Sequence, residues 1–253
     1  MEKQWRNIKD LILSYSYSNG KNYLVSFPKT GRTWLMYMLA KINDLSSDVF
    51  DIESTHDLSE IILEDGFRQD PNILFKFNKR FRYRRSKVLF LVRDPRDVIV
   101  SHYHQVKKRS KSPLVFDSIS EFVHDRFIGF NRVIYFYNLW AKQRHIPKSF
   151  YLVKYENLVS NGISELENIC EFLNITVDNS LIKNIYNESS ADKMRKKELS
   201  NQLKNFNNFG KERNYLKVRN AKIGGYMDEL DQIDIQYCNR QLQNLDPYFN
   251  YYS

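Results

Sequence analysis

Two segments of the chain combine basic side chains with the pattern of a strand that leads into a helix. The first segment, residues 27–34, reads F-P-K-T-G-R-T-W and follows the apolar run at 23–26. The start of a helix presents unpaired backbone N–H groups and the positive end of the helix dipole, and both favour a bound anion. Gly31 allows a ligand to approach the backbone closely. Three neighbours add positive charge and a hydroxyl group: Lys29, Arg32 and Thr33. The segment therefore predicts a phosphate-binding loop, and a solvated turn is the alternative.

The second segment begins with five consecutive apolar residues, 88–92, which predict a strand buried on both faces of a parallel sheet. Arg93 follows directly, so it is expected at the carboxyl end of a central strand. Ser101 lies two turns into the next helix and can face the same crevice. Ligands of open α/β sheets bind at that edge. Both residues are therefore candidate anion ligands. The alternative for Arg93 is a local ion pair with Asp94 or Asp97.

Together the two segments resemble the sulfotransferase family that uses 3′-phosphoadenosine 5′-phosphosulfate (PAPS). Residues 27–34 are similar to the family's 5′-phosphosulfate loop, and V-R-D-P-R-D-V-I-V-S at 92–101 is similar to its 3′-phosphate site. A third segment, R-N-A-K-I-G-G-Y at 219–226, is similar to the family's late R-K-G-x-x-G-D-W element, with Gly225 in place of the aspartate. The resemblance spans roughly residues 20 to 230 in the family's order.

This resemblance implies an enzyme that moves a sulfuryl group from PAPS to a hydroxyl or amine acceptor by in-line transfer. PAPS would be the co-substrate, adenosine 3′,5′-diphosphate (PAP) the product, and no metal is expected. Lys29 matches the catalytic lysine of the family's loop, which stabilises the leaving phosphate. The nucleotide-binding residues that the resemblance implies are Lys29, Thr30, Gly31, Arg32, Thr33, Trp34, Arg93, Ser101, Tyr155, Ser190, Arg219, Asn220, Lys222 and Gly224.

Three of these residues are expected near the adenine. Trp34 closes the phosphate-binding loop, and plain core packing is its alternative role. Tyr155 begins a Y-E-N turn that resembles the family's Y-E-D-like turn. The segment S-S-A-D-K-M at 189–194 is similar to the family's T-S-F-x-x-M element; it keeps Ser190 but has Ala191 in place of the aromatic that stacks on the base. Adenine is therefore expected to be held more loosely than in the family.

His56 is the predicted general base that removes the acceptor's proton. In the family a histidine follows the second strand, often after Lys-Thr, and E-S-T-H at 53–56 supplies Thr-His without that lysine. Asp57 is a candidate to orient the ring. An alternative alignment uses F-K-F-N at 75–78 and places Asn78 at this position. An amide cannot accept a proton at neutral pH, so His56 is preferred.

The composition agrees with a cytoplasmic protein that binds an anionic ligand. The net charge is +9, and the two cysteines, Cys170 and Cys238, are far apart, which favours a reducing compartment over a disulfide scaffold. The sequence has no apolar stretch long enough to span a bilayer and no signal-peptide pattern at its start. We therefore expect no transmembrane segment, while peripheral membrane contact remains open.

The strand and helix patterns alternate, which predicts one α/β domain over residues 1–253 with a P-loop-like nucleotide-binding core. Its central, mostly parallel sheet should be flanked by helices. The polar stretch 195–217 is interpreted as a flexible loop or lid that would bring Arg219 to the nucleotide. Strands are expected near 23–27, 49–54, 88–92 and 150–154, with a further apolar run at 73–77. Helices are expected near 4–15, 32–43, 96–108, 118–124, 129–144, 163–174, 179–187 and 229–244.

The acceptor is not defined by these patterns. The aromatic-rich stretch 127–140 is more typical of a core than of a pocket, but it is compatible with a small-molecule, lipid or glycan acceptor. His102 and His104 are two positions apart on a helix, so they do not share a face and suit surface or acceptor-side positions better than a metal site.

Two other function classes stay open. The spacing S-x4-G-R-T is compatible with a damaged phosphate loop of an ATP-dependent kinase, in which Ser26 replaces a glycine and Arg32 the lysine. The basic charge and many aromatics also suit a non-catalytic binder of a nucleotide or RNA. No DNA-reading helix pattern is found, so nucleic acid is not the expected partner, and the oligomeric state is not predicted.

Overall fold

The computed structural model describes residues 21–56, 83–109, 116–200 and 222–251. The helix predicted at 4–15 and the apolar run at 73–77 lie outside the described residues. The described elements are, in chain order, β1 (Asn22–Ser26), α2 (Arg32–Leu45), β2 (Ile52–Thr55), β3 (Lys87–Val92), α4 (Pro95–Arg109), α5 (Ile119–His124), α6 (Phe130–Gln143), β4 (Ser149–Lys154), α7 (Tyr155–Ser160), α8 (Gly162–Leu173), α9 (Asn179–Glu188), α10 (Ala191–Leu199), the 3₁₀ helix η3 (Gly225–Asp228), α11 (Gln232–Leu242) and the 3₁₀ helix η4 (Pro247–Phe249).

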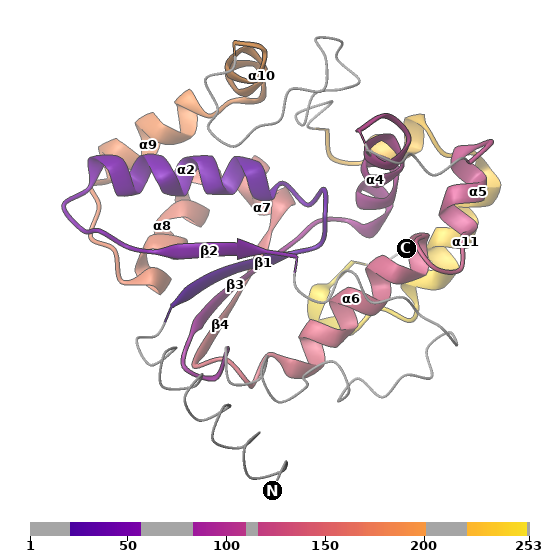
Figure 1. Cartoon of the computed structure of the whole chain (residues 1–253), viewed down its shortest axis with the longest axis horizontal. Helices are drawn as coiled ribbons and strands as arrows, with labels where there is room; N and C mark the ends of the chain where they lie inside the picture. The colour runs from indigo at the N-terminus through magenta and orange to yellow at the C-terminus, as the bar shows by residue number, and fades with distance from the viewer. Residues whose placement is uncertain (1–20, 57–82, 110–115, 201–221, 252–253) are drawn as a thin grey trace, which may run out of the picture.

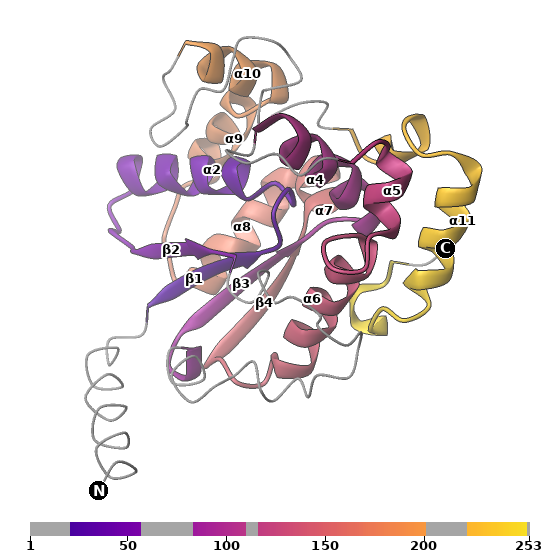
Figure 2. The same ribbon diagram turned by 45° about the vertical axis from the view of Figure 1, so that its right-hand side comes forward.

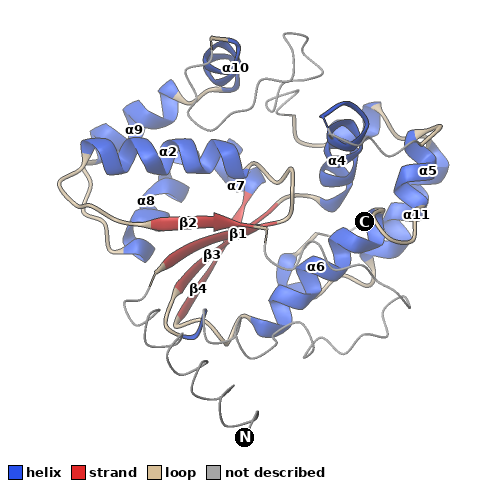
Figure 3. Ribbon diagram, viewed as in Figure 1, coloured by secondary structure: helices blue, strands red, loops and turns tan. Residues whose placement is uncertain are grey.

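The four described strands form one sheet in the order β2-β1-β3-β4, and every neighbouring pair is parallel (Figure 3). The register pairs Val25 of β1 with Phe90 of β3, and Phe90 with Leu152 of β4. Because all strands run in the same direction, their carboxyl ends meet at one edge of the sheet. This arrangement confirms the predicted α/β class with a parallel central sheet.

Helices cover both faces of the sheet, as Figures 1 and 2 show. Successive side chains of a strand point to opposite faces, so Phe90 packs with the cluster that includes α4, α6 and α11. Leu89 and Leu91 pack instead with the cluster that includes α2, α8 and α9. The apolar run 88–92 is continuous because both faces of β3 must be apolar.

Helix α6 carries the aromatic-rich stretch, and most of its rings belong to the core. Trp140 has no exposed surface and stacks on Phe90 with ring centroids 5.6 Å apart. Phe136 and Tyr137 are also buried. Phe127, which precedes the helix, is 42% exposed. The interpretation of these aromatics as core is confirmed for the buried rings.

The predicted loop at 195–217 is wrong in its first part, because α10 extends to Leu199. Residues 195–197 of this helix are all basic, and such a polar stretch is typical of a loop. The helix is held by a single strong apolar anchor, Met194, which is fully buried. The rest of the predicted loop up to residue 217 lies outside the described residues.

The two cysteines are free and buried, and they belong to the clusters on opposite faces of the sheet. Burial, the largest cause, raises the pKa of Cys170 to about 11 and that of Cys238 to about 12. Within the described ranges, no helix combines the length and the apolar character that a membrane span requires.

Candidate active site

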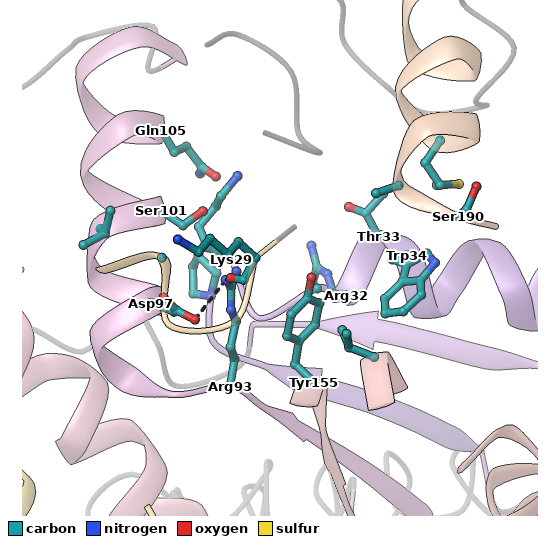
Figure 4. Close-up of a pocket in the computed structure, with 18 of the residues that line it drawn as sticks. Lys29, Arg32, Thr33, Trp34, Arg93, Asp97, Ser101, Gln105, Tyr155 and Ser190 are labelled. Atoms are coloured by element: carbon teal, nitrogen blue, oxygen red, sulfur yellow. Dashed lines mark hydrogen bonds and ion pairs between the residues drawn. The ribbon is translucent and has the colours of Figure 1, made fainter. Parts of the chain in front are cut away.

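A cavity of about 560 Å³ lies at the carboxyl edge of the sheet, between α4 on one side and α2 and α10 on the other (Figure 4). Most of the predicted site residues line it, although they come from segments far apart in the sequence. Those that line the cavity are Lys29, Gly31, Arg32, Thr33, Trp34, His56, Arg93, Ser101, Tyr155, Ser190 and Lys222. Arg219 and Asn220 lie outside the described residues.

The loop between β1 and α2 has an unusual backbone at two positions. Gly31, the N-cap of α2, has a φ of 99°, and Lys29 has a φ of 74°. A Cβ on Gly31 would lie 2.7 Å from Cδ2 of Tyr155, so conformation and close packing both require glycine here. The backbone of Lys29 is in the left-handed region although this residue carries a side chain. Such a conformation costs about 1 kcal/mol and is typical of functional sites. The loop therefore holds a strained, preformed shape at the start of a helix.

Thr30 differs from its neighbours because its side chain is buried and does not line the cavity. Its hydroxyl donates a hydrogen bond to the carbonyl of Phe27 at 3.0 Å. The side chain of Thr30 thus closes the loop internally.

Arg93 lies between three partners at the end of β3. Its Nη2 is 3.2 Å from Oδ2 of Asp97 and donates to the carbonyl of Lys222 at 2.8 Å. Its guanidinium carbon lies 4.5 Å from the centroid of the Tyr155 ring. The hydroxyl of Tyr137 bonds to both the backbone N–H and the carbonyl of Arg93, at 2.9 and 2.8 Å. The local ion pair with Asp97 is therefore present, and Arg93 lines the cavity as well.

Asp97 is the main residue of this site that sequence reasoning did not assign to it. The carboxylate is almost fully buried and accepts hydrogen bonds from the backbone N–H groups of Gly224 (2.9 Å) and Tyr226 (3.0 Å). It also lines the cavity. The available signal was its position four residues after Arg93, where it had been considered only as a local ion-pair partner of that residue.

The segment at 222–226 reaches the cavity mainly through its backbone. The carbonyl of Lys222 accepts from Arg93, while its ammonium group is 2.6 Å from a carboxylate oxygen of Asp228. Gly224 has a φ of 72° and does not line the cavity, whereas Gly225 does. The backbone N–H of Gly224 donates to Asp97, and the nucleotide-binding role of Gly224 stays a prediction.

His56 lies next to the loop, with Nδ1 2.7 Å from the carbonyl oxygen of Ser26. A carbonyl can only accept, so Nδ1 carries the proton and Nε2 keeps its lone pair. Burial, followed by the nearby charge of Arg32, lowers the pKa of His56 to about 4. The ring is thus neutral at pH 7 and able to accept a proton. Ser26 orients it; Asp57 and Asn78 lie outside the described residues.

His102 was expected at the surface or on the acceptor side, and the structure places it among aromatic rings next to the loop. Its ring packs edge-on against Phe27 and Phe122, with centroids 5.6 Å away in each case. Burial, followed by the charges of Arg132 and Lys29, lowers its pKa to about 3. His104 instead pairs with Glu229 at 2.5 Å. No cluster of three or more His, Cys, Asp or Glu side chains suited to a metal ion occurs in the described part of the chain.

The chain matches the family model of the sulfotransferase domain over residues 19–245. It belongs to the sulfotransferase family. Among similar curated sulfotransferases, Sulfotransferase 2A1 of Homo sapiens is 26% identical over 194 residues, which cover 70% of this chain and 67% of the relative. The 3-beta-hydroxysteroid sulfotransferase of Cavia porcellus is 26% identical over 196 residues, with the same two coverages. Sulfotransferase 6B1 of Danio rerio is 23% identical over 223 residues, or 83% of this chain and 72% of the relative.

Solved sulfotransferase-like structures have the same fold. Mouse sulfotransferase SULT7A1 complexed with PAP has a TM-score of 0.63 and 18% identity, and the match covers 88% of this chain and 83% of that one. Retinol dehydratase in a complex with retinol and PAP has a TM-score of 0.62 and 14% identity, with coverages of 88% and 80%. The predicted family, the enzyme class and the P-loop-like fold of this sulfotransferase are confirmed.

Proposed function

We propose that this sulfotransferase moves a sulfuryl group from PAPS to a hydroxyl or amine group of a small acceptor, by in-line transfer. One observation carries the proposal. A single cavity unites the loop with Lys29 and Arg32, the Arg93 side chain after β3, the backbone at Lys222 and the neutral imidazole of His56. A nucleotide with two separated anionic groups matches this distribution of positive charge.

The residues at the two phosphate positions suit such a nucleotide. Backbone N–H groups at the start of α2, together with Lys29 and Arg32, would hold the 5′ end. Arg93 and Ser101 would hold the 3′-phosphate. Asp97, a carboxylate beside that position, already has Arg93 and two backbone N–H groups as partners. Relatives whose structures contain PAP support the assignment of the donor.

The chemistry then divides between two residues. PAPS supplies the activated sulfuryl group when it is bound. Lys29 stabilises the negative charge that develops on the leaving phosphate oxygen. His56 accepts the acceptor's proton on Nε2, because its Nδ1–H is held by Ser26 and its pKa lies far below 7.

A small hydroxylated molecule is the acceptor class that the relatives favour, since one of them is named for a hydroxysteroid. Lipid headgroups and glycans remain alternatives to be screened, and the cytoplasmic location stays a prediction. A kinase using ATP is less well supported. The loop keeps neither the first glycine nor the lysine of that motif, and an Arg93–Ser101 site for a 3′-phosphate has no purpose with ATP.

A calorimetric titration tests the proposal. Tight binding of PAP without magnesium, together with weak binding of ATP, is the expected result. Lys41→Ala is a matched control, because this exposed lysine of α2 lies 3.9 Å from Asp44 and does not line the cavity. Arg93→Ala should abolish PAP binding while Lys41→Ala leaves it unchanged. Magnesium-dependent binding of ATP in place of PAP would contradict the proposal. A screen with radiolabelled donor against a mixed acceptor library would then identify the acceptor.

A further inference from the structure

The cavity has two chemically different sides. Lys29 and Arg93 form a basic side near α4, whereas Trp34 and Ser190 lie across from them, where α2 meets α10 (Figure 4). Arg32 lies between the two sides, and the lining of the second side beyond it is uncharged. It includes Trp34, Val159, Tyr186, Ala191 and Met194. An uncharged flat group, such as a nucleobase, suits this side, while phosphates suit the basic one.

Ala191 lies on this side, and in the T-S-F-x-x-M element that residues 189–194 resemble its position is an aromatic. A methyl group offers little surface on which a base can stack. Another ring must therefore supply that surface if a base binds here, because stacking on an aromatic is a main source of affinity for a base.

Tyr155 is poorly placed to supply it. The residue is only 5% exposed, and Arg93 lies over its ring at 4.5 Å. Its edge also lies close enough to Gly31 that a Cβ there would come within 2.7 Å. The ring of Tyr155 is thus occupied by contacts within the protein.

Tyr186 of α9 is better placed. It is partly exposed, lines the cavity, and its ring centroid is 6.1 Å from that of Trp34, at an interplanar angle of 45°. Its hydroxyl donates to the carbonyl of Leu158 at 2.8 Å and lies 3.2 Å from that of Val159. The hydroxyl is therefore used to fix the ring, and the ring surface remains for a ligand.

The neighbouring backbone is shaped to accept this ring. A Cβ on Gly162, the first residue of α8, would lie 2.0 Å from Cε2 of Tyr186. Glycine at this position makes room for the tyrosine. Trp34 is fixed in a similar way, since its indole N–H donates to the carbonyl of Ser189 at 2.7 Å. Both rings are held in place before a ligand arrives.

We propose that Tyr186, together with Trp34, forms the aromatic surface that binds the nucleobase and so replaces the ring missing at Ala191. This inference rests on the proposed function, because the base is that of the sulfuryl donor. Tyr186 is then a specificity-determining residue for the donor nucleotide.

Titration of PAP into wild type, Tyr186→Leu and Tyr186→Phe tests the inference. Tyr186→Leu should weaken PAP binding about tenfold, and Tyr186→Phe, which keeps the ring, should recover the affinity. Tyr248→Leu is a matched control, since this tyrosine of η4 lies against Arg144 and Phe249 and does not line the cavity. Equal affinity in wild type and Tyr186→Leu would overturn the inference. Absence of PAP binding by wild type would instead refute the proposed function.

A second measurement needs no folded variant. Wild-type protein can be irradiated with 8-azido-adenosine 3′,5′-diphosphate, which attaches covalently next to the base, and then mapped by peptide mass spectrometry. Label on α9 at Tyr186 is expected. Label found only on α7 or on α4 would place the base elsewhere and overturn the inference.

Discussion

The carboxylate of Asp97 lies 3.2 Å from the guanidinium of Arg93, and both side chains line the same cavity. The same carboxylate accepts hydrogen bonds from the backbone N–H groups of Gly224 and Tyr226. One buried acid thus holds the basic residue at the end of β3 and the segment before α11 in a fixed arrangement. By charge alone, a carboxylate beside a proposed phosphate position should weaken nucleotide binding. Removing Asp97 therefore tests whether its positioning of Arg93 matters more than its negative charge.

Asp97→Ala should weaken PAP binding at least tenfold, although it removes a negative charge from the cavity. The reason is that Arg93 loses the partner that orients it. The free energy of unfolding should also fall by about 2–3 kcal/mol, because buried backbone donors lose a charged acceptor. Calorimetry and denaturant titration measure the two effects. Tighter PAP binding in Asp97→Ala would mean that the carboxylate only repels the nucleotide.

Lys29→Ala should lower kcat by about 10³-fold or more, since charge on the leaving oxygen would lose its stabilising cation. Steady-state transfer with labelled donor measures this loss. Lys41→Ala serves as the control, because Lys41 is an exposed lysine of α2, the helix that follows the loop. This variant should keep wild-type turnover. Near-normal turnover in Lys29→Ala would remove this lysine from the proposed chemistry.

His56→Ala should lower kcat by about 10²–10⁴-fold, the usual contribution of a positioned base. The pKa of His56 is lowered to about 4, so the active neutral form predominates above that pH. The acidic limb of kcat/KM should therefore lie near pH 4 and not near 6.5, and it should vanish in the variant. His145→Ala, which changes an exposed histidine, is the control. A wild-type limb near 6.5 would argue for a different base.

The two histidines with lowered pKa values should make the fold sensitive to acid. His56 and His102 have pKa values of about 4 and about 3 in the folded chain, against about 6.5 when unfolded. Between the folded and the unfolded pKa values, the unfolded chain binds more protons than the folded chain. The contribution to stability is therefore complete above about pH 6.5 and is lost as the pH decreases towards 4. Each histidine contributes up to about 1.4 kcal/mol per pH unit. Denaturant titrations at pH 7 and pH 5 should show a smaller loss in His102→Phe than in wild type; equal losses would contradict the assignment.

Gly31→Ala should destabilise the protein by about 1–3 kcal/mol and weaken nucleotide binding. The φ of 99° is unfavourable for alanine, and the new Cβ would meet Tyr155 at 2.7 Å. Gly225→Ala is the control for stability, because its Cβ would meet no atom closer than 3.7 Å among those described. Thermal unfolding compares the two variants. A similar small effect in both would mean that the loop tolerates a side chain at position 31.

The sequence allowed the fold and the basic side of the cavity to be predicted because each depends on a contiguous segment. The run 88–92 defines a buried strand, and the loop at 27–34 brings basic side chains to the start of a helix. The roles of Asp97 and Tyr186 could not be predicted in this way. Asp97 acts on a backbone 127 residues away, and the place of Tyr186 depends on the glycine at position 162. Such contacts exist only once the helices have packed.

Helix α10 shows the opposite limit. Its sequence was interpreted partly as a loop because most of its residues are polar. Only one side of this short helix is buried, so few apolar residues mark it as a helix. His56 was proposed as the general base from its residue type and its position after β2, but the carbonyl that orients its ring was not predicted. Every residue has a backbone carbonyl, so the residue type does not indicate which carbonyl accepts a hydrogen bond.

The buried thiols of Cys170 and Cys238 make the protein suitable for labelling at a single introduced cysteine. Both side chains are inside the protein, and their raised pKa values keep them protonated at neutral pH, so maleimide reagents should leave them unmodified in the native state. A single cysteine introduced at the exposed position of Asn187, on the rim of the cavity, would then accept a fluorescent dye selectively. Nucleotide arrival and release could be followed in real time on an otherwise native chain.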